Sequence, residues 1–109
     1  MKEIKAYIHN HRIADVVHAL KTSALCNKDS LSGCRCHAVV PFKNPFEVTD
    51  PNDRQYYSLQ IAQTVVDEFK LELVCEDKEV NQVVALIKQA SGLNPAIYVT
   101  DIVFRGEKN

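Results

Sequence analysis

In two parts of this chain, a pattern typical of a β-strand is followed within a few residues by a pattern typical of an amphipathic helix. This order limits the possible folds more than any other feature of the sequence. Apolar residues alternate with polar ones over residues 2–8 and again over residues 69–76, which is the period of a strand with one buried face. Over residues 13–22 and 77–91, apolar residues recur at helical spacing instead. The sequence therefore predicts two strand–helix units.

Two further strands complete these units. Residues 34–42 alternate in the same way, and residues 96–104 are rich in β-branched and aromatic side chains after an Asn-Pro turn. Between the two units, three prolines fall within residues 41–54, and proline cannot donate a hydrogen bond to a sheet ladder. We therefore expect a long excursion from the sheet over residues 41–54.

Residues 55–68 are compatible with two secondary structures. Tyr57, Ile61 and Val65 recur at helical spacing, whereas the β-branched run Thr64-Val65-Val66 would also suit a strand. We favour a helix for this segment.

The resulting order is β-α-β, a long loop, and β-α-β. It predicts an α+β fold of the ferredoxin-like βαββαβ type, with a four-stranded antiparallel sheet in the order 4-1-3-2 and both helices on one face. A chain of 109 residues has room for one hydrophobic core, so residues 1–109 are expected to form a single domain. Tyr7, Val39, Val74 and Tyr98 would then lie on the face without helices, and a closed three-fold assembly would cover them.

The composition excludes several classes of protein. The chain is 46% hydrophobic and 25% charged with a net charge of -1, which gives no basic surface for nucleic acid. The strand pattern begins at the first residues, and the chain has no run of about 18 apolar residues, so we expect a cytoplasmic protein without direct membrane insertion. In that compartment the four cysteines are reduced thiols or metal ligands rather than a disulfide framework.

Four segments resemble the PII family of nitrogen-regulatory signalling proteins. The opening of the chain reads MKEIKAYI over residues 1–8 and RIADVVHAL over residues 12–20, which is similar to the first strand and helix of that family. The second half reads KLELVCED over residues 70–77 and AIYVTD over residues 96–101, which is similar to its third and fourth strands. The chain thus looks like a single PII-like domain.

The resemblance implies a non-enzymatic signal-transduction protein that forms a homotrimer around a central barrel of sheets. In such a protein a T-loop, here about residues 42–57, reaches a target that is a membrane transporter or an enzyme. An adenine nucleotide such as ADP, ATP or AMP would be the effector. The residues at positions of the effector site are Gly33, Phe42, Lys43, Gly92 and Arg105. The T-loop residues that would contact the partner, or instead pack back on their own subunit, are Phe46, Val48, Arg54, Tyr56 and Tyr57.

A second interpretation is a metal-binding or redox-sensing protein on the same trimeric scaffold. Cys34, Cys36 and His37 offer two thiolates and an imidazole, which suit a soft metal ion such as Zn²⁺ or Cu⁺. The expected strand order places Cys75 beside the first two cysteines, close enough for a shared metal or a reversible disulfide. The same cysteines would also serve as small buried core residues.

Other polar residues give weaker signals. His9, His11 and His18 could suggest a metal site, but only their spacing supports it, and we interpret them as exposed polar side chains. Asp77 follows Glu76 at a strand-to-helix junction and is expected to cap the helix rather than form a catalytic pair. The chain has three glycines and lacks a phosphate-binding loop or a nucleophile elbow, so no enzymatic activity is expected.

Overall fold

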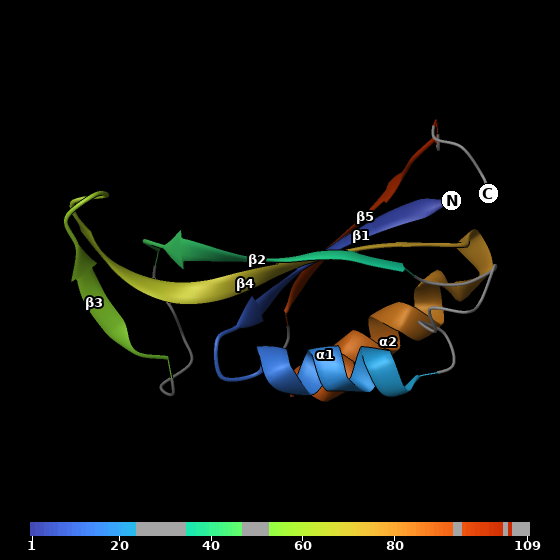
Figure 1. Ribbon diagram of the computed structural model, residues 1–109, viewed down its shortest axis with the longest axis horizontal. Helices are drawn as coiled ribbons and strands as arrows, with labels where there is room; N and C mark the ends of the chain where they lie inside the picture. The colour runs from blue at the N-terminus through green and yellow to red at the C-terminus, as the bar shows by residue number, and fades with distance from the viewer. Residues whose placement is uncertain (24–34, 47–52, 93–94, 104, 106–109) are drawn as a thin grey trace.

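A single sheet with two helices on one side forms the body of this protein (Figure 1). The computed structural model describes residues 1–23, 35–46, 53–92, 95–103 and 105, and at residues 36 and 37 it describes the backbone. In chain order the elements are β1 (Lys2–His9), α1 (Ile13–Thr22), β2 (Arg35–Asn44), β3 (Gln55–Ser58), β4 (Gln63–Cys75), the short 3-10 helix η2 (Asp77–Glu79), α2 (Val80–Ser91) and β5 (Ala96–Asp101).

The predicted four-stranded, ferredoxin-like βαββαβ fold is wrong, because the described chain forms a five-stranded antiparallel sheet. The strands lie in the order β2-β4-β1-β5, and β3 also pairs with β4. β4 is 13 residues long and continues past the end of β1, where His9 pairs with Glu68. Beyond that point β3 pairs with β4 in place of β1, starting with Gln55 opposite Val66, on the side of β4 away from β2. It thus pairs backbone groups of β4 that β1 is too short to reach.

The helix predicted over residues 55–68 is also wrong. This segment forms β3, a turn over residues 59–62 and the start of β4. The Ala62 amide donates to the Ser58 carbonyl at 2.8 Å, and Ala62 has a φ of 58°, so the chain reverses direction there. Tyr57 and Val65, which recur at helical spacing, do not share a buried face, because Val65 is 1% exposed whereas Tyr57 is 61% exposed. We call residues 55–66 the arm.

The arm lies beyond the part of the sheet that the helices cover. In Figure 1, β3 and the first half of β4 extend to the left, while α1 and α2 lie under the other half of the sheet. The subunit is correspondingly elongated, measuring 45 × 28 × 20 Å.

β2 runs two residues further than the sequence predicted. Its prediction ended at Phe42 because Pro41 interrupts the ladder, yet the strand continues to Asn44. Since β2 is at the edge of the sheet, the missing amide of Pro41 is tolerated there. A register shift between Cys36 and Ala38 also moves Val39 opposite the buried Leu71. Val39 therefore belongs to the helix side of the sheet, and its predicted place on the other face is wrong.

The hydrophobic core lies between the sheet and the two helices, which pack against each other. Alternate residues of β1 and β4 point toward the helices, as the strand patterns predicted, and meet the apolar stripe of each helix. The core residues are Ile4, Ala6, Ile8, Val16, Leu20, Leu71, Leu73, Cys75, Val83 and Ile87.

The second helix ends as predicted but begins differently. Gly92 has a φ of 67° and occupies the left-handed C-cap position that favours glycine. The predicted cap by Asp77 is wrong, because no side chain caps this helix start. The Asp77 carboxylate instead lies 2.8 Å from the amino group of Met1, which lowers the pKa of Asp77 from its ordinary value through a hydrogen bond.

The face of the sheet without helices, which we call the open face, mixes aromatic and charged side chains. The ring of Tyr7 makes edge-to-face contacts with Phe42 and Tyr98, at centroid distances of 5.6 and 6.0 Å. Charged pairs lie among them, including Lys70 and Glu72, whose Nζ and Oε1 atoms are 3.6 Å apart. This face is therefore less apolar than the alternation alone predicted.

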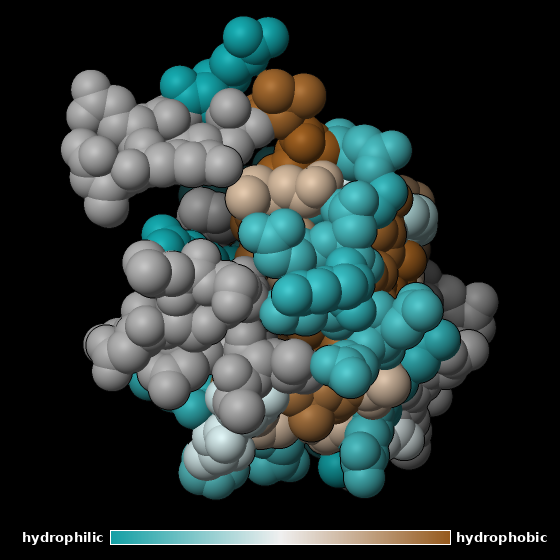
Figure 2. Space-filling model, turned by 90° about the vertical axis from the view of Figure 1, so that its right-hand side faces the viewer, coloured by the Kyte–Doolittle hydropathy of each residue, from teal (hydrophilic) through white to brown (hydrophobic). Residues whose placement is uncertain are grey.

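Hydrophilic residues make up most of the coloured surface at the end of the molecule opposite the arm (Figure 2). At 10 and 12 residues, α1 and α2 are shorter than the roughly 20 apolar residues that a bilayer span requires. Within the described residues, no helix is long and apolar enough to cross a membrane.

Candidate functional site

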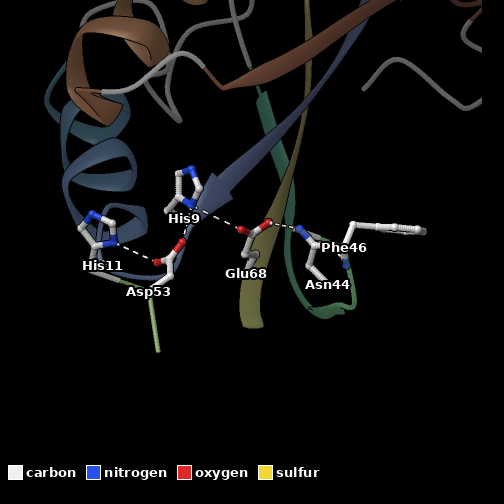
Figure 3. Close-up of polar contacts among 6 residues, drawn as sticks. All are labelled: His9, His11, Asn44, Phe46, Asp53 and Glu68. Carbon is white, nitrogen blue, oxygen red and sulfur yellow. Dashed lines mark hydrogen bonds and ion pairs between the residues drawn. The ribbon is translucent and has the colours of Figure 1, made fainter. Parts of the chain in front are cut away.

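Five polar residues from four separate segments meet where β1 ends and the arm begins (Figure 3). We call them the polar cluster. Two come from the end of β1 and the turn after it, one ends β2, one precedes β3 and one lies on β4: His9, His11, Asn44, Asp53 and Glu68. The sheet register explains this meeting, since His9 pairs directly with Glu68 and β3 begins where β1 stops.

Each carboxylate of the cluster has one oxygen near His9 and the other near a different side chain. The Nδ1 atom of His9 lies 2.5 Å from Oδ2 of Asp53 and 3.3 Å from Oε1 of Glu68. The second oxygen of Asp53 is 3.0 Å from Nδ1 of His11. The second oxygen of Glu68 accepts a hydrogen bond of 3.3 Å from Nδ2 of Asn44. Figure 3 shows the resulting chain of contacts, with the two carboxylates on either side of the His9 ring nitrogen.

The two carboxylates of the cluster are withdrawn from water. The Asp53 side chain is 0% exposed and the Glu68 side chain 8% exposed. Burial raises the pKa of Glu68 above its ordinary value, and the nearby His9 and the Asn44 hydrogen bond offset only part of this increase. Among the described residues, the ion pairs of these two carboxylates are with histidines and not with lysine or arginine.

Replacing Glu68 by glutamine is expected to stabilise the folded protein increasingly as the pH rises. A carboxyl whose pKa is raised by folding favours the native state below its unfolded pKa, and this contribution is lost as the pH rises through the folded pKa. A glutamine side chain has nearly the same shape as that of Glu68 but no charge, so its burial does not become more unfavourable as the pH rises. Thermal unfolding with a chelator present should give equal midpoints for the two proteins near about pH 4, and a higher midpoint for E68Q near about pH 8.

The control for this pH series is Glu72→Gln, two residues along the same strand. Lys70 lies 3.6 Å from the Glu72 carboxylate and offsets its charge, so this variant should show no gain in stability as the pH rises. A loss of stability of E68Q relative to the wild type toward high pH would contradict this prediction. It would mean that the contacts of the charged Glu68 carboxylate stabilise the fold by more than its burial destabilises it.

The arm and the end of β2 bring exposed apolar side chains to one end of the molecule. Leu59 at the turn is 88% exposed, Phe46 is 79% exposed and Tyr57 is 61% exposed. Tyr56 is held differently: its hydroxyl donates to Asp67 at 2.6 Å and accepts a short hydrogen bond from Lys43. Of the predicted partner-binding residues, Phe46, Arg54 and Tyr57 are thus exposed at or beside the arm, Tyr56 is partly fixed, and Val48 lies outside the described residues.

Four of the five predicted effector-binding residues lie in the part of the chain that the structure describes, and their use by an effector stays a prediction. Phe42 pairs with Glu68, which places it beside the polar cluster, and Lys43 follows it on β2. Gly92 precedes β5 and lies against the Arg12 guanidinium, whereas Arg105 follows the other end of β5. Gly33 lies outside the described residues.

The predicted cysteine cluster is described only in part. Cys75 ends β4 and is 1% exposed on the helix side of the sheet, as the alternation predicted. The Cys36 backbone pairs with Leu73, so the start of β2 does lie beside the end of β4. Cys34 lies outside the described residues, and only the backbone of His37 is described. The grouping of these residues around a soft metal ion stays a prediction.

The histidines were interpreted from the sequence as exposed polar residues, and for His9 this interpretation is wrong. Its side chain is 22% exposed and contacts both buried carboxylates, while His18 lies exposed on α1 outside the cluster. Sequence reasoning missed Asp53, Glu68 and Asn44 altogether. The signal available in advance was a histidine at the last position of a strand, and this gave no indication of which acids would lie beside it.

The arrangement offers one imidazole nitrogen and two carboxylate oxygens that all lie within 4.8 Å of one another. Such a set can bind a cation or share protons among its members. No protein-family model matches this chain, and no curated protein matches it. The interpretation of the cluster and of the arm therefore rests on their chemistry and geometry.

Proposed function

We propose that this protein is a PII-like regulator: a cytoplasmic, non-enzymatic homotrimer that binds a small effector and modulates a target transporter or enzyme through its arm. The observation that carries the proposal is the exposure of large apolar side chains on the arm, at Tyr57 and Leu59, and beside its base, at Phe46. Large apolar side chains exposed to solvent in one region of a protein are typical of a surface that binds a partner. The first residues of the arm, 55–57, also overlap the segment 42–57 where the resemblance to PII proteins implies a T-loop.

The polar cluster supports a link between effector binding and the position of the arm. Asp53 lies two residues before β3, while His9 and Glu68 belong to the strands of the main sheet. Contacts between Asp53 and His9 therefore connect the root of the arm to the sheet that the helices cover. An effector that strengthens or breaks these contacts would change how firmly the arm is held.

The space beside the arm favours a small effector within one subunit. A groove of about 250 Å³ is lined by Asn44, Pro45 and Phe46 from the region of β2 and by Gln55, Gln63, Thr64, Val65 and Val66 of the arm. Sites that enclose a drug-sized ligand measure roughly 300–1,000 Å³. An adenine nucleotide held at this groove would therefore need contacts outside it, which the resemblance to PII proteins implies a neighbouring subunit would supply.

A tryptophan placed at Leu59 is expected to report effector binding. The chain contains no tryptophan, and Leu59 is 88% exposed at the tip of the arm, so the new side chain gives a single fluorescent signal at little structural cost. Titration with ADP, ATP, AMP and divalent metal ions should change the emission of L59W with at least one of them. A matched control is Gln89→Trp, which places the same reporter at an exposed position of α2, away from the arm.

An emission change in L59W together with a constant signal in Q89W would support an effector that acts on the arm. The proposal would be overturned if calorimetry detected binding of one of these effectors while the emission of L59W stayed constant throughout. It would also be overturned if none of them bound.

A further inference from the structure

We propose that His9, Asp53 and Glu68 form a binding site for a divalent transition-metal ion such as Zn²⁺. This inference deepens the proposed function, because it names the class of effector, but the binding itself can be tested without reference to the arm. The three side chains present one donor atom each, and these atoms all lie within 4.8 Å of one another. Tetrahedral ligands at about 2.0–2.2 Å from zinc lie roughly 3.3–3.6 Å from one another, so His9 and Glu68 are already spaced for it, and the hydrogen-bonded Asp53 oxygen would move about 1 Å away from the His9 nitrogen.

The chemistry of the donors indicates the class of metal. An imidazole nitrogen together with two carboxylate oxygens is a set found around Zn²⁺ and its first-row neighbours. Calcium and magnesium prefer sites made entirely of oxygen ligands and gain little from the His9 ring. Three protein ligands also leave coordination positions for water or for a further ligand, as in open zinc sites.

The second oxygen of each carboxylate is already occupied by a different neighbour. His11 contacts Oδ1 of Asp53 at 3.0 Å, and Asn44 donates to Oε2 of Glu68 at 3.3 Å. These contacts leave Oδ2 of Asp53 and Oε1 of Glu68 directed toward the His9 nitrogen (Figure 3). Neighbours of this kind, which orient ligands without touching the metal, are the usual support of a metal site.

The charge of the cluster supports a bound cation. The Asp53 and Glu68 side chains are 0% and 8% exposed, and the described residues supply histidines rather than lysine or arginine as their ionic partners. The Nδ1 atom of His9 carries at most one hydrogen, so it can donate to one of the two carboxylates and not to both. A divalent ion between them would offset both negative charges and accept the His9 lone pair.

Metal binding at this place would join the root of the arm to the sheet. His9 ends β1, Glu68 lies opposite it on β4, and Asp53 lies two residues before β3. A metal bound by all three would restrain the segment that leads into the arm, so the metal state would determine how the arm is presented to a partner.

The test is calorimetric titration of the tag-free protein with Zn²⁺, in the wild type and in the variants His9→Ala and Glu68→Gln. We expect one ion per chain for the wild type and at least a hundredfold weaker binding for each variant, because each loses a direct ligand and even supporting residues contribute about 10–100-fold. His18→Ala is the matched control, since His18 is exposed on α1 outside the cluster and should leave the affinity unchanged. Circular dichroism of each variant establishes that the fold is retained.

Substitution by Co²⁺ separates this site from the predicted cysteine site. Cobalt bound by His9, Asp53 and Glu68 should give visible absorption without the near-ultraviolet band of a cobalt–thiolate bond. A thiolate band that persisted in E68Q and disappeared in Cys36→Ser would overturn the assignment to the polar cluster. Absence of Zn²⁺ binding to the folded wild type would overturn it as well.

The outcomes for the metal site and for the regulator can be told apart. If Zn²⁺ binds and E68Q abolishes binding, the site stands even when the emission of L59W stays constant, and the proposed action on the arm fails. If a nucleotide changes the emission of L59W and Zn²⁺ does not bind, the regulator stands and the metal site is refuted.

Discussion

Replacing Leu73 by alanine is expected to destabilise the folded subunit by about 3 kcal/mol, since removal of a fully buried leucine side chain leaves a cavity as well as losing transfer free energy. Leu73 is 0% exposed in the middle of the core, where β4 faces the two helices. Urea unfolding followed by circular dichroism, at equal subunit concentrations, should show a large drop in the midpoint.

The matched control for this variant is Leu59→Ala at the turn of the arm. Leu59 is 88% exposed, so the same change of side chain should alter the free energy of unfolding by no more than about 0.5 kcal/mol. Similar midpoints for L73A and L59A would mean that β4 does not face the helices in the way described here.

Replacing Tyr98 by glutamate is expected to convert the proposed homotrimer into monomers. Tyr98 is 60% exposed on the open face, where its ring contacts Tyr7, and the three-fold assembly would cover this surface. A carboxylate buried there in three copies would lose its hydration, and Lys5 opposite it on β1 would offset only part of this loss. Sedimentation at micromolar concentration should give three times the 12.3 kDa chain mass for the wild type and one chain mass for Y98E.

The control for assembly is Leu59→Glu, which adds the same charge at the tip of the arm and away from the open face. This variant should sediment like the wild type. A wild type that sediments as a 12.3 kDa monomer would remove the trimer from the proposed function, while the metal site would be untouched because all three of its ligands belong to one chain.

The sequence predicted the elements whose signals are local. The alternation in β1 and around Leu71 and Leu73 placed the correct residues in the core, and Gly92 marked the end of α2. These predictions succeeded because a strand or helix with one buried face must repeat its apolar residues at a fixed period. The relative order of β2, β4, β1 and β5 also agrees with the order predicted for the four strands.

The arm could not be predicted in the same way. Residues 55–68 contain both helical spacing and β-branched residues, so local preference did not distinguish the two structures. The deciding factor was the backbone of β4 beyond the end of β1, where hydrogen-bonding groups without a partner favour a strand alongside. The fifth strand, and with it the departure from the predicted fold, follows from this pairing.

What the sequence determined by itself is therefore the set of locally periodic elements, two strand–helix units and the strands beside them, because their burial pattern lies within a few neighbouring residues. What only the tertiary structure decided is the arm and the polar cluster. His9 and Asp53 are separated by 44 positions along the chain, yet their side chains meet because β3 begins where β1 ends along β4. No periodic pattern relates residues so far apart, and their contact depends on which strand pairs with the free length of β4.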